Sequence, residues 1–174
     1  MAEPADPAAD RRWLIEAIEL SRRCPPSVTA FSVGAIIVGA DGNLLSTGYS
    51  REVQPADHAE EVALARLGLP RSAGQQWPPG PGQPGAAGRQ PPDLSGATMY
   101  SSLEPCAART SRPVPCADLI VASGIGRVVI AWREPPLFVA GGGAIRLSKA
   151  GVVVVVMPEL EAAARAVNAH LSAD

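Results

Sequence analysis

The stretch ATMYSSLEPC (residues 97–106), followed by PCADLIVASG (115–124) and RVVIAW (127–132), decides the fold class of this chain. The sequence predicts a strand over 97–103 and a second strand over 127–132. Between them, a helix is expected from Cys116 to Ser123, because a glycine follows its last residue. A strand, a helix and a strand in succession are typical of a layered α/β domain.

The same alternation continues on both sides of this unit. Upstream, a helical stripe follows Asp10, a candidate N-cap, and ends before two prolines. Asp41-Gly42 predicts a turn that joins two strands into a hairpin. The other predicted elements are helices over 10–24, 58–67, 143–150 and 158–170, and strands over 33–38, 44–49 and 152–157. A hairpin followed by alternating strands and helices predicts a single α/β domain over residues 10–174, built on a mixed sheet.

Two segments do not follow this alternation. Residues 1–9 are rich in alanine, proline and acidic side chains, and we expect a flexible tail there. Residues 70–95 hold 7 of the 18 prolines and five glycines, which predicts a surface insertion without regular structure. Loops of this length are often functional, so the insertion can either cover a site or lie apart from it.

Composition excludes several classes of protein. No apolar run approaches the ~20 residues of a membrane span, and no basic region precedes an apolar segment at the N-terminus, so we expect a cytoplasmic protein without a membrane anchor. A net charge of −2 is a poor match for a nucleic-acid backbone. Three cysteines are an odd number, which argues against a disulfide framework and leaves metal binding, a reactive thiol or simple burial.

One group of rare residues can carry chemistry. His58, Cys106 and Cys116 each stand where a predicted strand ends or a predicted helix begins. One imidazole and two thiolates suit zinc, and three protein ligands leave a fourth position for water, which is the pattern of catalytic sites. Glu60, two residues beyond the histidine, can carry protons between that water and a leaving amine. The pattern predicts a hydrolytic site with one zinc ion per chain.

Simpler interpretations exist for each residue alone. Glu60 can belong to a capping box with Asp57, three residues before it. The cysteines can be small buried side chains, and we assign Cys24 that structural role. His170 is expected to be solvated or to cap the last helix. The glycines at 141–143 lack a phosphate-binding pattern and predict a structural loop.

The combined motifs resemble the cytidine deaminase-like superfamily. The narrower similarity, from about Cys24 to Met157, is to the pyrimidine deaminases of riboflavin biosynthesis, notably the fungal type. The stretches that carry it are TAFSVGA (29–35), LSTGYSRE (45–52), HAEE (58–61), LEPC (103–106) and PC (115–116). Nine residues separate the two cysteines, as in the fungal pattern, whereas the common nucleoside and tRNA deaminases have two.

The resemblance implies a three-layer α/β/α sandwich that replaces a ring amino group with a carbonyl and releases ammonia. The implied substrate is a diaminopyrimidinone that carries a ribosylamino or ribitylamino 5′-phosphate. The implied roles are zinc ligation by His58, Cys106 and Cys116, and proton transfer by Glu60. The candidate substrate contacts are the backbone at Ser102 and Glu104, the ring of Phe31, the side chains of Ser50 and Glu52, and, for the phosphate, Arg109 and Arg112. Core packing for Phe31, turn formation for Ser50 and Glu52, and solvation for the arginines remain alternatives.

Some departures keep other functions open. The Pro-Asn-Pro segment usual in bacterial riboflavin deaminases is missing before the first strand, and Ala107 and Ala108 stand where those enzymes usually have a histidine. A cytidine- or dCMP-type deaminase, or another small-molecule deaminase, is the main alternative. A nucleic-acid-editing deaminase and a non-catalytic zinc module are weaker ones. Because deaminases of this fold often assemble, we expect a homo-oligomer, most simply a dimer.

Overall fold

A computed structural model describes residues 6–69, 92–135 and 142–171. Five strands form one sheet in the order β2-β1-β3-β4-β5. The strands are β1 (Gly34–Val38), β2 (Leu44–Tyr49), β3 (Thr98–Ser101), β4 (Arg127–Ile130) and β5 (Val153–Val156). β1 runs antiparallel to β2 and β3, whereas β3, β4 and β5 are parallel to one another. The predicted mixed sheet is confirmed.

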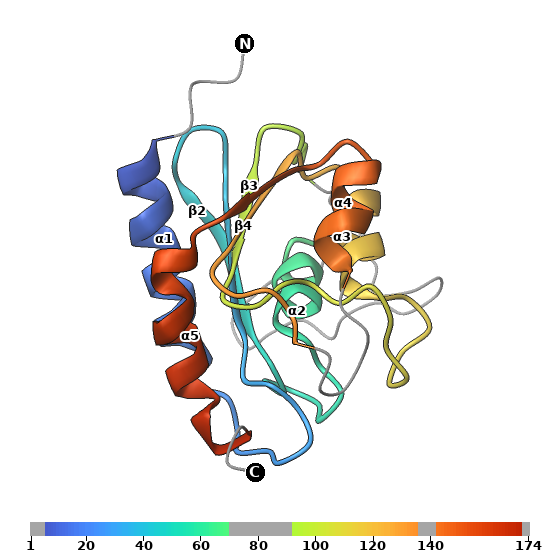
Figure 1. The fold of residues 1–174 in the computed structure, drawn as a ribbon. Coiled ribbons are helices and arrows are strands. Elements are labelled where there is room, and N and C mark those ends of the chain that lie inside the picture. The colour runs from blue at the N-terminus through green and yellow to red at the C-terminus, as the bar shows by residue number, and fades with distance from the viewer. Residues whose placement is uncertain (1–5, 70–91, 136–141, 172–174) are drawn as a thin grey trace.

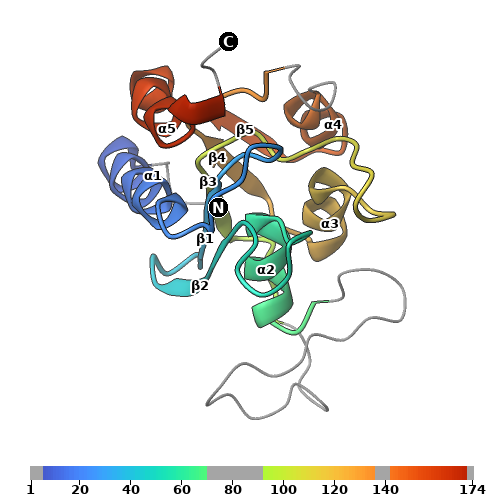
Figure 2. The same ribbon diagram turned by 90° about the horizontal axis from the view of Figure 1, so that it is seen from below.

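Helices cover both faces of the sheet (Figures 1 and 2). On one face lie α2 (Ala59–Arg66), α3 (Cys116–Ser123) and α4 (Gly143–Lys149), and we call this the site face. On the other lie α1 (Pro7–Ser21) and α5 (Glu161–Val167), and we call this the support face. Every residue of β1 is buried, because that strand is covered on both faces and paired at both edges. The architecture is a three-layer α/β/α sandwich.

The first helix corrects one prediction. Asp6, not Asp10, is the N-cap of α1: its side chain accepts a hydrogen bond from the Ala8 amide, and Pro7 occupies the first turn. Residues 7–9 are therefore helical and not part of a tail, and residues 1–5 lie outside the described range. Asp10 instead lies inside the helix, where its carboxylate bonds Tyr100 and Arg127. A sequence pattern cannot separate two aspartates four residues apart.

Two glycines set the distance between the helices and the hairpin. A Cβ atom on Gly34 would lie 2.1 Å from the Ala17 carbonyl oxygen of α1. A Cβ atom on Gly48 would lie 2.4 Å from the Ala59 carbonyl oxygen, at the start of α2. Both helices therefore pack directly on the hairpin backbone, one on each face. This close approach fixes the position of the first turn of α2, which follows His58.

Two further boundaries differ from expectation. Leu94 is buried in the core, so residues 92–95 belong to the folded domain and not to the predicted insertion, of which residues 70–91 lie outside the described range. The predicted last helix is divided into a 3₁₀ turn at Pro158–Leu160, α5, and a second turn at Ala169–Leu171. No helix in the described ranges combines the length and the apolar character needed to cross a membrane.

Candidate active site

Three candidate metal ligands meet on the site face. His58 is the residue before α2, Cys106 follows β3, and Cys116 is the first residue of α3. The Nδ1 atom of His58 lies 3.6 Å from Sγ of Cys106 and 3.5 Å from Sγ of Cys116, and the three ligand atoms all lie within 4.8 Å of one another. Tetrahedral zinc bonds to one nitrogen and two sulfurs require separations of about 3.5–3.8 Å. The donor set and its spacing therefore fit zinc.

The first turn of α3 lies beside both thiols. The backbone amide of Cys116 donates to Sγ of Cys106 at 3.3 Å, and the next amide of α3, that of Ala117, donates to the Cys106 carbonyl at 3.1 Å. The hydrogen bond with Cys116 lowers the pKa of Cys106 to about 4, burial opposes this shift, and the interaction with His58 adds to it. The same pairing with Cys106, together with burial, raises the pKa of Cys116. The pair thus holds one thiolate readily, as a metal ligand must.

Glu60 lies beside these ligands on the first turn of α2. Its carboxyl is 3% exposed, and Oε1 accepts a hydrogen bond of 2.9 Å from the Ser101 hydroxyl. Burial raises its pKa, so this carboxyl can hold a proton that an exposed glutamate would release. The capping-box alternative is wrong: Asp57 accepts from the amides of Val53 and Gln54 and does not cap α2.

A cavity of about 390 Å³ opens beside Glu60 and the metal ligands. Its walls come from the segment before β1, the loop after β2, the cysteine-bearing loop and Glu134 in the segment after β4. Phe31 forms part of one wall and packs edge-on against Trp132, with ring centroids 5.3 Å apart. The volume is in the range that accommodates a small molecule.

The predicted substrate contacts divide into two groups. Phe31, Ser50, Glu104 and Arg109 line the cavity, whereas Glu52, Ser102 and Arg112 are not among its lining residues. Glu52 instead forms an ion pair of 2.6 Å with Arg66, and the Ser102 hydroxyl accepts from the Gly34 amide. Contact of any of these residues with a substrate stays a prediction.

Two of the cavity residues hold backbone in place. The Ser50 hydroxyl accepts from the Val33 amide at 3.2 Å. The Glu104 carboxylate accepts from the amides of Glu134 at 3.0 Å and Ala144 at 2.7 Å. Glu104 therefore joins the segment after β3 to the segment after β4 and to the first turn of α4.

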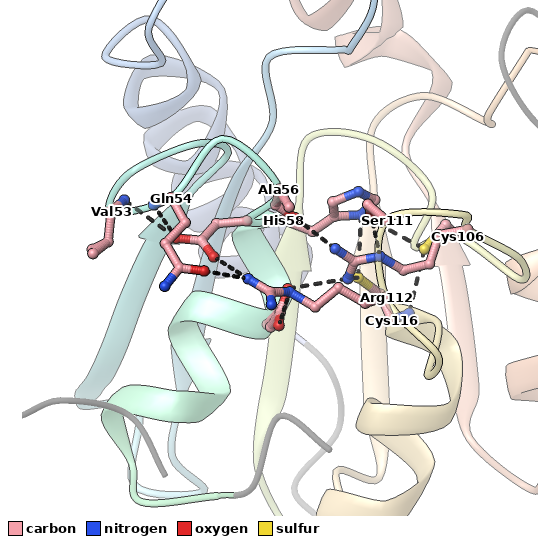
Figure 3. Close-up of polar contacts among 11 residues, drawn as sticks. Val53, Gln54, Ala56, His58, Cys106, Ser111, Arg112 and Cys116 are labelled. Atoms are coloured by element: carbon pink, nitrogen blue, oxygen red, sulfur yellow. Dashed lines mark hydrogen bonds and ion pairs between the residues drawn. The ribbon is translucent and has the colours of Figure 1, made fainter. Parts of the chain in front are cut away.

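Both arginines of the cysteine loop have partners within the chain (Figure 3). Arg109 pairs with Glu61 at 3.1 Å and donates to the Ala56 carbonyl at 2.6 Å. Arg112 pairs with Asp57 at 2.9 Å and with Glu61 at 3.0 Å. These contacts join the cysteine loop to the segment around His58. Phosphate binding by the two arginines stays a prediction.

Sequence reasoning missed three residues of this site. Ser101 bonds Glu60, and Glu61 pairs with the two arginines, but neither belongs to a spacing that indicates chemistry. Glu134 lines the cavity with one buried oxygen that has no hydrogen-bond partner among the described residues, and burial, with nearby thiolate and carboxylate charge, raises its pKa to about 8. A usable signal was available for Glu134, because residues just beyond the carboxyl ends of parallel strands line ligand crevices.

The cavity wall that carries Phe31 is held from two directions. Arg51, which has a φ of 60°, donates to the carbonyls of Pro25 and Phe31. Asn168, after α5, accepts from the Ser32 amide at 2.7 Å and donates to the Ser32 carbonyl at 3.0 Å. Asn168, which follows the last helix of the support face, therefore holds a segment that forms part of the cavity wall.

The remaining histidine and cysteine lie outside the ligand set. The His170 ring nitrogen lies 2.8 Å from the Ser27 carbonyl oxygen, and the residue is exposed, in agreement with the solvated alternative. The Cys24 thiol donates to the Val33 carbonyl at 3.4 Å, and burial raises its pKa. The structural role assigned to Cys24 is consistent with this contact.

Comparison with known proteins places this site in a family. Residues 7–132 match the family described as the cytidine and deoxycytidylate deaminase zinc-binding region, and the chain belongs to that family. The predicted cytidine deaminase-like fold and family are thereby confirmed.

Particular relatives narrow the similarity. The chain is 38% identical over 150 residues to a diaminohydroxyphosphoribosylamino-pyrimidine deaminase of Schizosaccharomyces pombe, covering 86% of this chain and 32% of that protein. It is 36% identical over 134 residues to the riboflavin biosynthesis protein RibD of Escherichia coli, covering 75% of this chain and 29% of that protein. The chain thus spans about a third of the length of these relatives.

A solved structure of similar size also matches. The crystal structure of Aspergillus oryzae Rib2 deaminase, a C-terminal deletion mutant, superposes with a TM-score of 0.67 at 27% identity. The match covers 94% of this chain and 98% of that one. The sandwich described above therefore corresponds to nearly the whole of that deaminase fragment.

Proposed function

We propose that this chain is a zinc-dependent hydrolytic deaminase of a free aminopyrimidine nucleotide. The preferred substrate is the diaminopyrimidinone ribosylamino or ribitylamino 5′-phosphate of riboflavin biosynthesis, as the names of the similar S. pombe and E. coli proteins suggest. The observation that carries the proposal is the placement of His58, Cys106 and Cys116 around one point, with buried Glu60 beside them in a cavity.

The residues of the chain divide the chemistry among them. His58, Cys106 and Cys116 would hold zinc, which supplies an electrophilic centre that makes a water molecule acidic near neutral pH. Glu60 takes a proton from the attacking water and delivers it to the departing amino group, which leaves as ammonia while the ring carbon gains the oxygen. Ser101 holds Glu60 Oε1 in place by its hydrogen bond, and Phe31 excludes bulk water from one side of the cavity.

Three finer features belong to the same proposal. One zinc ion per chain follows from a single set of three ligands among the described residues. A cytoplasmic location suits thiolate ligands, because zinc requires Cys106 and Cys116 in the reduced state. Assembly as a homodimer is a further expectation, which a solution mass measurement tests.

A second candidate activity is deamination of cytidine or dCMP. The description of the matching family supports it, since the family is defined by cytidine and deoxycytidylate deaminases. The same ligands and Glu60 would serve that reaction, so only the substrate separates the two candidates. The diaminopyrimidine substrate is preferred because the similar S. pombe protein, which aligns with 86% of this chain at 38% identity, carries that activity in its name.

The decisive experiment is a screen for ammonia release from aminopyrimidine, cytosine and purine nucleotides, with the zinc-loaded full chain. We expect the diaminopyrimidinone phosphate to give the highest kcat/KM. Glu60→Gln should lose about 10²–10⁴-fold in kcat, because the proton carrier is removed. The exposed Glu159→Gln is the matched control and should keep wild-type rates. Ammonia release from dCMP alone would support the second candidate, and no release from any nucleotide would refute the deaminase proposal.

A further inference from the structure

Four charged residues, two buried acids and two partly buried arginines, connect the two chain segments that carry the candidate metal ligands. Arg109 and Arg112 lie in the loop between Cys106 and Cys116, and Asp57 and Glu61 lie on either side of His58. The arginine side chains are 3% and 11% exposed, and both acidic side chains are 0% exposed. We call these four residues, Asp57, Glu61, Arg109 and Arg112, the charge clamp.

The charges of the clamp balance. Two guanidinium groups face two carboxylates, and Glu61 receives one arginine on each oxygen, at 3.1 Å and 3.0 Å. Placing a charge in a protein interior costs free energy unless a partner and hydrogen bonds compensate for it. Here additional acceptors are the Ala56 carbonyl for Arg109 and the Gln54 side chain for Arg112. A set of four buried charges with so many partners fixes the relative position of the segments that carry it.

The clamp acts across the ligand set. Each ion pair joins the cysteine loop to the segment around His58. The pairs therefore hold the candidate ligands of the two segments close together without a metal. Arg109 Nη1 also lies 3.9 Å from Cys116 Sγ, which brings positive charge to a candidate ligand. Residues that orient metal ligands affect metal affinity without touching the metal.

We propose that the charge clamp holds His58, Cys106 and Cys116 in zinc-binding geometry before the metal arrives. Arg109 and Arg112 are in this view positioning residues, and not the phosphate contacts that the sequence suggested. The inference rests on the proposed zinc site, but it concerns metal affinity rather than the choice of substrate. Because the clamp is made by the chain alone, it should be present in the metal-free protein.

Zinc affinity is the direct test. The full chain and its variants Arg109→Gln and Arg112→Gln would compete for zinc with a chromogenic chelator. We expect each variant to bind zinc about 10–100-fold more weakly than the wild type, the usual effect of removing a residue that orients a ligand. Arg127→Gln is the matched control, since it breaks another largely buried ion pair, the one with Asp10 of α1. Its zinc affinity should stay within about twofold of wild type, because the two sites are independent.

A second variant serves as a control for effects on folding. Arg109→Gln leaves an uncompensated buried carboxylate, so Glu61→Gln/Arg109→Gln, which removes one charge of each sign, should fold more stably than the single variant. Thermal unfolding of the metal-free proteins would verify this. We expect the double variant to keep the weakened zinc affinity, because the pairs made by Glu61 are absent and only the Arg112–Asp57 pair still joins the two segments.

The outcomes separate the two proposals. Equal zinc affinity in wild type, Arg109→Gln, Arg112→Gln and the double variant would overturn the clamp and leave the deaminase proposal intact. A raised KM for the phosphorylated substrate with unchanged zinc affinity would also overturn the clamp and assign the arginines to phosphate binding. A wild-type chain that binds no zinc would refute the proposed function, and the clamp with it.

Discussion

Each face of the sheet has a cluster of arginine–carboxylate ion pairs, but the two clusters join different parts of the molecule. On the support face, Arg127 at the start of β4 binds Asp10 of α1 through two contacts of 2.6 Å and 2.8 Å, and Tyr100 donates to the same carboxylate. On the site face, Arg109 and Arg112 bind acidic residues that flank a metal ligand. The first cluster joins a helix to the sheet, and the second joins two ligand-bearing segments. The role of a buried ion pair therefore depends on what its backbone carries.

The largest expected difference between the faces is in zinc binding. Cys116→Ser, on the site face, should abolish stoichiometric zinc binding, because a serine hydroxyl is a poor replacement for a thiolate ligand. Cys24→Ser, after the support-face helix α1, should retain about one zinc per chain as measured by atomic absorption. Equal zinc loss in both variants would mean that the ligand set is misassigned.

The two close-packed glycines give a matched pair, one for each face. Gly34→Ala and Gly48→Ala both place a methyl group against helix backbone, so each should lower the free energy of unfolding by about 1–3 kcal/mol in urea titrations. Only Gly48→Ala should also weaken zinc binding, since it displaces the start of α2 next to His58. If Gly34→Ala weakened zinc binding equally, the two faces would not be functionally separate.

A variant of Asn168 tests whether residues of the support face also affect substrate binding. Asn168→Ala removes both hydrogen bonds to Ser32 and should cost about 1–3 kcal/mol of stability, because buried backbone groups lose their partner. With Phe31 less firmly held, we expect a higher KM with little change in kcat and none in zinc content. Steady-state kinetics on the zinc-loaded variant would measure this, and an unchanged KM would restrict Asn168 to a purely structural role.

The smallest expected effect concerns Glu134 and pH. Burial raises the pKa of Glu134 to about 8 in the folded protein, from 4.5 in the unfolded chain. Between pH 4.5 and pH 8 the folded protein therefore binds more protons than the unfolded chain. Its contribution to stability is full below about pH 4.5 and is lost as the pH rises through 8. Glu134→Gln cannot ionise, so its melting temperature relative to wild type should increase from pH 5 to pH 9 in the metal-free protein. The exposed Glu159→Gln should show a constant difference.

The sequence predicted the order of elements and the three candidate ligands that the structure brings together for identifiable reasons. His58, Cys106 and Cys116 belong to residue types that occur only five times in the chain, and their order is chemically specific. Strand and helix positions followed from short apolar runs bounded by glycine and proline, so most boundaries differ by a few residues or fewer. Both kinds of signal are local, and local signals are what one sequence contains.

The remaining features depend on contacts between distant parts of the chain. Glu61 looked like an ordinary acidic residue in the first turn of a helix, and its partner Arg109 lies 48 positions away. The sequence pattern placed Leu94 in a proline-rich insertion, whereas the structure buries it in the core. Asp10 was the predicted cap, but Asp6 bonds the Ala8 amide, and Asp10 pairs instead with Arg127, 117 positions later. Residue types alone do not specify such partners.

The ligand set is shared between two halves of the polypeptide. His58 comes with α1, the β1–β2 hairpin and α2, and the two cysteines come with the rest of the sheet, beyond residues 70–91. Neither half alone holds enough ligands for the site. A gene divided between these halves should therefore produce two peptides that bind zinc tightly only after they reassociate along β1 and β3. Metal binding would then report the assembly of a split protein.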